Sequence, residues 1–379
     1  MADDLSAAGL RAAFESVQPF TVGIEEEVML LDPETLDLAP RAAELLDRVA
    51  GDARFKAELP AAQVEIVTEP KRSAAEALDA LQAGRRDLAR AAEGLARLAV
   101  AGTHPFADPE GELSAVKRYD RIRAEYGPIA RRQLVAALQV HVAVGGAERA
   151  LAAYNGLRPY LPELAALGAN ARFHDGRDTG LASVRPKISE LLPRQGVPPA
   201  LDSWDRFAEE LRWGARAGAV AEPRLWWWEL RPHPRFGTLE VRVPDAQTTV
   251  AEAAGVVGLV HALVASIAER HDAGEELPAA PRWRIEENRW SAARHGVEGA
   301  MADLRTGEPE PTRQRLLRLI GDVEPAAARL GSAQALSQAR CLVEANGAIR
   351  QRTVGRSVGA RGLTAWMAER FLLAGPPCG

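Results

Sequence analysis

The sequence contains very little cysteine and no long apolar run. Its two cysteines, Cys341 and Cys378, lie 37 positions apart and form no CxxC pair, which argues against a thiolate zinc site. A disulfide between them is compatible with the sequence, but a reduced pair is the commoner state in the cytosol. No segment approaches the ~18 apolar residues of a membrane span, and the acidic N-terminus lacks the apolar core of a signal peptide. We therefore expect a cytoplasmic protein with no membrane partner.

The chain also lacks a strong excess of charge of one sign. The 47 Lys and Arg residues against 52 Asp and Glu give a formal net charge of −5, so no nucleic-acid partner is expected. GxGxxG and P-loop patterns are absent as well. Apolar residues make up 47% of the sequence, which is ample for a core, and neither repeats nor a linker interrupt it. We predict a single domain over residues 1–379, with a sheet-bearing core at about 19–300 and a helical C-terminal region at about 301–379.

Several short segments alternate apolar and polar residues, which is typical of strands. Strands are predicted at 20–31, 63–69, 134–145, 224–230 and 237–243. Helices are predicted for about 25 residues after Ser73, at 147–170, from Thr249 to about 270, and after 283, with a break near 304–312. The stretch 171–200 reads as a long ordered loop. Because strict alternation of strand and helix is absent, we predict an α+β fold with a largely antiparallel sheet.

The faces of these strands carry the most informative pattern. Residues two apart on a strand share a face, and in four of the strands one face is apolar while the other is not. If these strands share a sheet, the second faces bring together Glu25, Glu27, Glu65, Gln139, His141, Glu240 and Arg242. Crowded carboxylates repel one another unless a positive centre lies among them, and divalent cations with oxygen ligands meet that need. The alternative is a half-exposed sheet whose polar face meets water.

Six motifs occur in the order and approximate spacing of one known family. They are GIEEEVMLLDP (23–33), VEIVTE (64–69), LQVHVAV (138–144), GRDTGLASVRP (176–186), GTLEVRVPD (237–245) and ENRWSAARHG (287–296). In these motifs the chain is similar to the carboxylate–amine ligase family that includes the second class of glutamate–cysteine ligases. The resemblance implies a glutamine-synthetase-like fold, in which a curved antiparallel sheet with flanking helices holds ATP and magnesium ions, with Mn²⁺ able to substitute.

The resemblance also implies roles for individual residues. The implied metal-binding acids are Glu25, Glu27, Glu58, Glu65 and Glu240. Gln139 and His141 are implied as cofactor-binding residues, although many relatives carry His-x-His at these positions. Arg242 is implied to approach the substrate or the transferred phosphate, and phosphoryl transfer needs several positive centres. Of the further arginines, we favour Arg185 and Arg235, because Pro and Gly order their loops; the others are Arg177, Arg231, Arg289 and Arg294.

Three functions are compatible with this pattern. The first is an ATP- and Mg²⁺-dependent ligase that forms an amide through an acyl phosphate, with glutamate and cysteine as the default carboxylate and amine. The second is a guanidino-kinase-like phosphotransferase on the same fold, and the third is a non-catalytic protein that only binds nucleotide or metal. Residues 226–228, three tryptophans, are interpreted as packing residues rather than an adenine platform. A homo-oligomer is compatible with all three functions.

Overall fold

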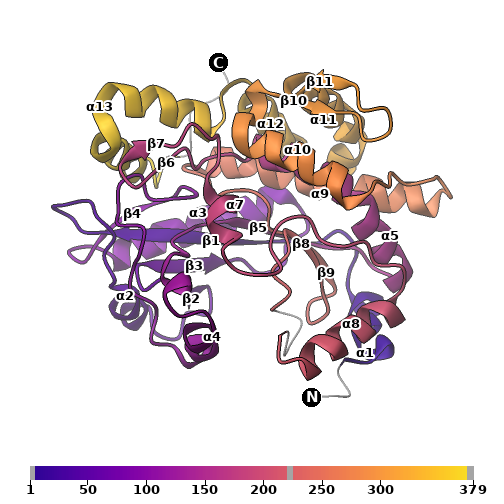
Figure 1. Ribbon diagram of the computed structural model, residues 1–379, viewed down its shortest axis with the longest axis horizontal. Helices are drawn as coiled ribbons and strands as arrows, with labels where there is room; N and C mark the ends of the chain where they lie inside the picture. Colours follow the sequence, from indigo (N-terminus) through magenta and orange to yellow (C-terminus); the bar gives the residue numbers. More distant parts are fainter. Residues whose placement is uncertain (1–4, 220–224, 374–379) are drawn as a thin grey trace.

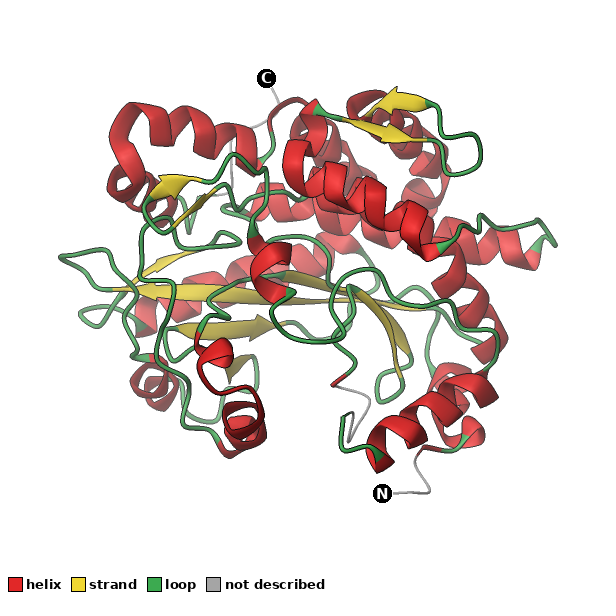
Figure 2. Cartoon of the chain, in the orientation of Figure 1, coloured by secondary structure: helices red, strands yellow, loops and turns green. Residues whose placement is uncertain are grey.

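A curved seven-stranded sheet forms the middle of the computed structural model, which describes residues 5–219 and 225–373 (Figures 1 and 2). Its strands are β1 (Val22–Leu31), β2 (Phe55–Ala57), β3 (Gln63–Val67), β4 (Arg97–Ala99), β5 (Leu138–Ala143), β8 (Leu230–His233) and β9 (Thr238–Val241). They pair antiparallel in the order β2-β3-β1-β5-β9-β8, and β4 pairs with β1. The predicted α+β fold with an antiparallel sheet is confirmed. Cys378 lies outside the described residues.

Three helices cover the apolar face of the sheet. Helix α3 (Ala74–Ala91) packs against β1 and β3, α5 (Ala147–Leu157) against β8 and β9, and α9 (Val250–Asp272) against β5. A capping box starts α9 as predicted, because the Thr249 side chain accepts from the backbone N–H of Glu252 and the Glu252 carboxylate accepts from that of Thr249. By length and composition α9 is apolar enough to cross a membrane, but 89% of its most apolar window is buried. It is therefore a helix of the core.

The remaining elements surround this core. They are the helices α1 (Ala7–Ser16), α2 (Ala42–Arg48), α4 (Asp120–Arg131), α6 (Leu161–Leu167), α7 (Arg185–Ser189), α8 (Trp204–Arg216), α10 (Arg282–His295), α11 (Thr312–Arg329), α12 (Ala333–Ala345) and α13 (Gly347–Glu369), and the hairpins β6 (Phe173–His174)–β7 (Arg177–Asp178) and β10 (Ala300–Ala302)–β11 (Pro309–Pro311). In Figure 1 the helical C-terminal region, orange to yellow, lies above the sheet, whereas α2, α4 and α8 lie below it.

Three sequence-based predictions need correction. The helix after Ser73 ends at Ala91, because the chain turns at Gly94 with φ +70° before β4 begins. Of the strand predicted at 224–230, Arg224 lies outside the described residues, and among the others the strand begins only at Leu230. The predicted connection after it contributes the rest of β8. The loop at 171–200 contains the β6–β7 hairpin and α7. The predicted break near 304–312 is confirmed, and part of the β10–β11 hairpin occupies it. Hairpin pairing and core packing override the local propensities at these places.

A buried ion pair lies on the apolar side of the sheet. Strand parity turns Glu26 toward the helices, and Arg85 of α3 contacts both of its carboxylate oxygens at 2.6 and 2.7 Å, with both side chains 0% exposed. Arg85 also donates to the carbonyl oxygens of Gln247, Thr248 and Phe371 at 2.7–3.0 Å. Because its donors are satisfied, the guanidinium connects β1, the segment after β9 and the C-terminal end of the chain.

Candidate active site

The polar side chains predicted from strand parity lie on one face of the sheet. The strand register aligns Glu25 with Gln139, Glu27 with Glu65, and His141 with Glu240. These side chains are largely withdrawn from solvent, with Glu240 0% and Gln139 3% exposed. The alternative of a half-exposed sheet with a solvated polar face is therefore wrong. The prediction from strand parity that these side chains share one face is confirmed.

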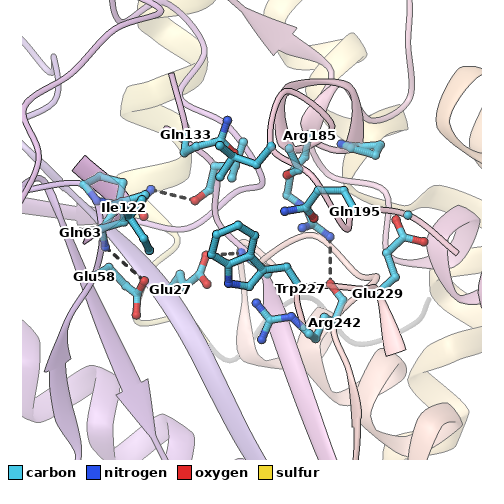
Figure 3. A pocket seen from close by; sticks show the side chains of 18 of the residues that line it. Glu27, Glu58, Gln63, Ile122, Gln133, Arg185, Gln195, Trp227, Glu229 and Arg242 are labelled. Atoms are coloured by element: carbon cyan, nitrogen blue, oxygen red, sulfur yellow. Dashed lines mark hydrogen bonds between the residues drawn. The ribbon is translucent and has the colours of Figure 1, made fainter. Parts of the chain in front are cut away.

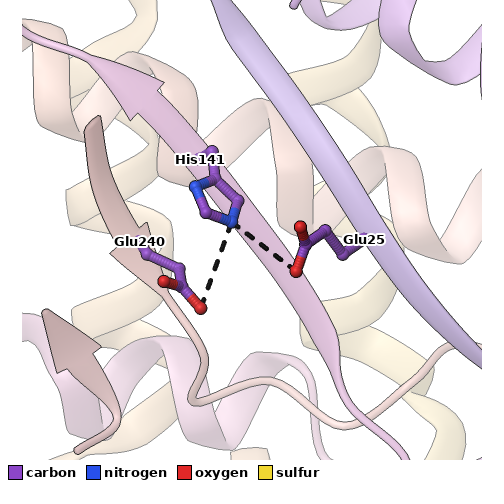
Figure 4. A group of neighbouring side chains, drawn as sticks. All are labelled: Glu25, His141 and Glu240. Atoms are coloured by element: carbon purple, nitrogen blue, oxygen red, sulfur yellow. Dashed lines mark ion pairs between the residues drawn. The ribbon is translucent and has the colours of Figure 1, made fainter. Parts of the chain in front are cut away.

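Glu25, His141 and Glu240 form a group on this face whose potential ligand atoms all lie within 4.8 Å of one another (Figure 4). The His141 Nε2 atom lies 3.7 Å from a Glu25 oxygen and 4.0 Å from a Glu240 oxygen. Its Nδ1 atom is 3.0 Å from the Thr238 hydroxyl, while Nε2 is buried without a hydrogen-bond partner in the described residues. An imidazole nitrogen and two carboxylates around one point are a ligand set for a divalent cation, so the residues fit a metal.

Two arginines hold Glu240. Arg231 of β8 contacts both carboxylate oxygens of Glu240, with distances of 2.5 and 2.9 Å. Arg242 donates through Nη1 to Glu240 and to the side-chain oxygen of Gln139. Burial by itself raises the pKa of Glu240, but Arg231 and Arg242 lower it, and the net result is well below the usual range. Glu240 is therefore a carboxylate anion set between two guanidinium groups.

The other acids are less well compensated. Glu27 accepts from the Ala137 N–H at 2.7 Å and from the Gln139 amide at 2.9 Å, yet burial raises its pKa. Burial and the nearby Glu27 raise the pKa of Glu58 to about 7. Burial and the charges of Glu25 and Glu58 raise the pKa of Glu65 well above its usual value. Raised pKa values are expected where carboxylates crowd together without a cation.

Glu25 is the exception among these acids. Burial alone raises its pKa, but the neighbouring His141, 3.7 Å away, lowers it to about 2. Glu58, which the resemblance placed on a bend before β3, lies beside these acids: its carboxylate is 3.4 Å from the Tyr119 hydroxyl and 3.5 Å from Arg118. All five predicted acids are therefore gathered in one region, although their role as metal ligands stays a prediction.

The acidic face borders two adjoining cavities. The larger, of about 490 Å³, is lined by Glu25, Glu27, Glu58, Glu65, Gln139 and Arg242 among others. The smaller, of about 180 Å³, is shown in Figure 3 and shares Glu27, Glu58 and Arg242 with the larger one. Trp227 also lines both cavities, whereas Trp226 is buried in the core as predicted. The pair offers room for two ligands beside one set of acids.

Two predicted arginines are placed differently from the expectation. Arg185 lines the smaller cavity, but its Nε donates to Asp245 at 2.7 Å and its Nη2 donates to the Val243 carbonyl at 2.6 Å. Its guanidinium therefore fastens the segment after β9. Arg235 is exposed in the β8–β9 turn, over the Phe236 ring and outside both cavity linings. Arg231, rather than Arg235, is the arginine of this hairpin that faces the site.

Several residues of the site were not selected from the sequence. Lys56, Arg118 and Tyr119 line the larger cavity, and Glu229 lines the smaller one, where it pairs at 2.6 Å with Arg289, an arginine already named from the sequence. Lys56 belongs to the three-residue strand β2, and Arg118 and Tyr119 to a single 3₁₀ turn. Such short elements show no periodicity in the sequence. The charged pattern KxE at 56–58 was the only signal available.

The curved antiparallel sheet with its flanking helices belongs to the glutamine-synthetase-like fold class. A solved glutamate–cysteine ligase from Francisella tularensis, in complex with AMP, has a similar fold, with a TM-score of 0.69 and 12% identity over 95% of this chain and 90% of that one. A bifunctional glutathione synthetase from Pasteurella multocida gives a TM-score of 0.62 and 13% identity, covering 97% of this chain and 53% of that one.

Sequence comparison gives the family. The model described as glutamate-cysteine ligase family 2 matches residues 21–362, and the chain belongs to this family of ligases. It is 38% identical over 95% of its length, and 99% of the relative's, to a Rubrobacter xylanophilus protein named "putative glutamate–cysteine ligase 2-3". A Corynebacterium glutamicum protein named "putative glutamate–cysteine ligase 2" is 35% identical over 90% of this chain and 92% of its own. The predicted family and enzyme class are confirmed.

Proposed function

We propose that the protein is an ATP- and Mg²⁺-dependent carboxylate–amine ligase that forms an amide through an acyl phosphate. The observation that carries this proposal is the group of Glu25, His141 and Glu240 with Arg231 and Arg242 beside it. Carboxylates and an imidazole nitrogen suit a divalent cation, and adjoining guanidiniums suit phosphate oxygens. The names of the relatives support glutamate and cysteine as substrates, and the AMP in the Francisella structure supports an adenine nucleotide.

The residues of the site have distinct tasks in this reaction. Bound Mg²⁺ would neutralise charge on the nucleotide phosphates. The ligands proposed for it are Glu25, Glu27, Glu58, Glu65 and Glu240, with Gln139 and His141 beside them. Arg242 meets the negative charge on the transferred phosphoryl group, and Arg185 positions Arg242 by holding the carbonyl groups that follow it.

The chemistry then proceeds in two steps. A carboxylate oxygen of the first substrate attacks the γ-phosphorus of ATP, and ADP leaves with the electron pair of the broken P–O bond. The nitrogen of the amine attacks the acyl carbon, inorganic phosphate leaves, and the nitrogen loses a proton. The larger cavity, which carries the acids, suits the nucleotide, and the smaller cavity across Trp227 suits the second substrate.

We further propose that residues 1–379 act as one catalytic domain, in the cytoplasm where ATP and free amino acids are available. The helices α11 and α12 pack against α9, so the C-terminal region shares the core of the sheet-bearing part. A homo-oligomer is compatible with this proposal, and gel filtration at several protein concentrations tests it.

The test is product analysis with Mg-ATP, glutamate or another carboxylate, and a panel of amines with cysteine first. A ligase releases ADP and inorganic phosphate in equal amounts and yields an amide of matching mass. A guanidino kinase yields ADP and a phosphorylated acceptor without free phosphate, and a binding protein yields neither. Turnover that persists in excess EDTA rules out the metal requirement, and the absence of amide with every pair rules out the ligase.

A further inference from the structure

The larger cavity contains one lysine among its acids. The chain has four lysines, at positions 56, 71, 117 and 187, and of these Lys56 lines the larger cavity. It lies on β2, where the register aligns it with Glu65 of β3. Its Nζ atom is 3.8 Å from a Glu65 oxygen and 4.0 Å from a Glu25 oxygen. One ammonium group thus lies between two carboxylates that come from different strands.

Lys56 balances the negative charge of Glu65, whereas the other acids of the site have other residues as partners. Glu240 has two arginines, Glu58 has Arg118, and Glu27 has a backbone N–H and an amide. Within the described residues, Lys56 is the only cation within 4.0 Å of Glu65. It also supplements His141 at Glu25. Removal of the Lys56 charge therefore leaves the carboxylate of Glu65, which is 6% exposed, without a cation within 4.0 Å among the described residues.

The geometry of this contact differs from that of the arginine pairs. Arg231 contacts Glu240 with both branches at 2.5 and 2.9 Å, whereas the Lys56 distances are close to 4 Å and shared between two partners. An ammonium on a flexible stem is a movable point charge, unlike a planar guanidinium. The Lys56 side chain is 38% exposed, so its head can move toward solvent without leaving a void in the core.

We propose that Lys56 is a built-in counter-ion that competes with a divalent cation for Glu25 and Glu65. This inference rests on the proposed function, in which these carboxylates hold the metal. Lys56 stabilises the metal-free protein, and it weakens metal binding until its ammonium withdraws. The phosphates of a nucleotide in the same cavity are an anionic partner for the withdrawn ammonium, so metal and nucleotide favour each other's binding.

The test uses Lys56→Met and measures Mn²⁺ affinity by isothermal titration calorimetry without nucleotide, together with thermal unfolding in EDTA. Unit charges about 4 Å apart attract each other strongly in a partly buried site. Because Mn²⁺ no longer has to displace the ammonium from the carboxylates, Lys56→Met should bind Mn²⁺ at least ~10-fold more tightly than wild type. It should also unfold at a lower temperature in EDTA and gain more from added Mn²⁺. Lys56→Gln should behave in the same way, and Lys56→Arg, which keeps the charge, should stay within about threefold of wild type.

Lys71→Met is the matched control, because Lys71 also contacts a glutamate, Glu69 at 3.6 Å, but lies outside both cavity linings. It should leave Mn²⁺ affinity unchanged. If wild type binds Mn²⁺ and both Lys56→Met and Lys56→Gln bind it equally or more weakly, the inference is overturned while the proposed function stands. If neither wild type nor the Lys56 variants bind Mn²⁺, the metal requirement in the proposed function fails, and the inference fails with it.

Discussion

The contacts of Arg231 and Arg242 with Glu240 lead to a prediction about the stability of the protein that is independent of catalysis. Glu240 is 0% exposed, and Arg231 and Arg242 both contact its carboxylate. In Glu240→Gln the shape is kept, but Arg231 and Arg242 lose the buried carboxylate that both of them contact. Removing one partner of a buried ion pair costs about 3–5 kcal/mol, because the other charge stays buried and loses that attraction.

That cost converts into a measurable change of melting temperature. At about 2.1 cal/mol/K per residue, the unfolding entropy of a chain of this length is roughly 0.8 kcal/mol/K. The Tm of Glu240→Gln should therefore fall by about 4–6 °C in EDTA. The pKa of Glu240 is far below its usual value, so the stabilisation is present above the unfolded-state pKa and is lost only as the pH falls through the much lower folded-state pKa. The loss in the variant should therefore be the same across pH 6–8.

The assay is differential scanning calorimetry of wild type, Glu240→Gln and a control. Glu298→Gln is the control, because Arg352 contacts both Glu298 oxygens at 2.6 and 2.7 Å, but the Glu298 side chain is 40% exposed. An exposed pair of this kind contributes about 0–1 kcal/mol, so its Tm should change little. If Glu240→Gln is as stable as wild type in EDTA, the contacts of Glu240 with the two arginines do not stabilise the protein, and the reasoning is refuted.

Three further changes test other parts of the structure. Arg242→Lys keeps a charge but loses the planar fork, so kcat should fall ~100-fold with little change in nucleotide affinity. If steady-state kinetics show that kcat and nucleotide affinity fall equally, Arg242 has no specific role in the transition state. Arg85→Met leaves Glu26 buried alone and should cost about 3–5 kcal/mol in urea unfolding, whereas Glu26→Leu with Arg85→Met should recover much of that loss; no recovery argues against the pair. Burial and Glu27 raise the pKa of Glu58 to about 7, so its protonated form stabilises the metal-free protein below the unfolded-state pKa, and this is lost as the pH rises to 8. Melting in EDTA at pH 5.5 and 8 should show this loss, and Glu58→Gln should reduce it.

Strand parity predicted most of the candidate site because alternation is a local property. Within the run Glu25-Glu26-Glu27, period two assigns the outer residues to one face and the middle one to the other, and the structure confirms both assignments. The same rule assigned Gln139, His141 and Glu240 to one face before any contact was known. Strand parity does not predict the partner of Glu26. Arg85 lies 59 residues away and contacts Glu26 only because α3 packs against the sheet.

The arginines show the limit of such reasoning more clearly. The segment 224–230 has the aromatic composition of a strand, yet the strand begins at Leu230, so Arg231 lies in β8 opposite Glu240 and Arg235 lies in the turn. The position at which the strand starts thus decides whether Arg231 or Arg235 faces the acids. Lys56 is harder still, because a three-residue strand has no period of its own and exists only through its pairing with β3. Glu25, Glu27 and Glu65 lie on strands whose alternation is visible in the sequence, whereas Lys56 and Arg118 come from a three-residue strand and a 3₁₀ turn. The sequence therefore shows these acids more readily than the cations beside them.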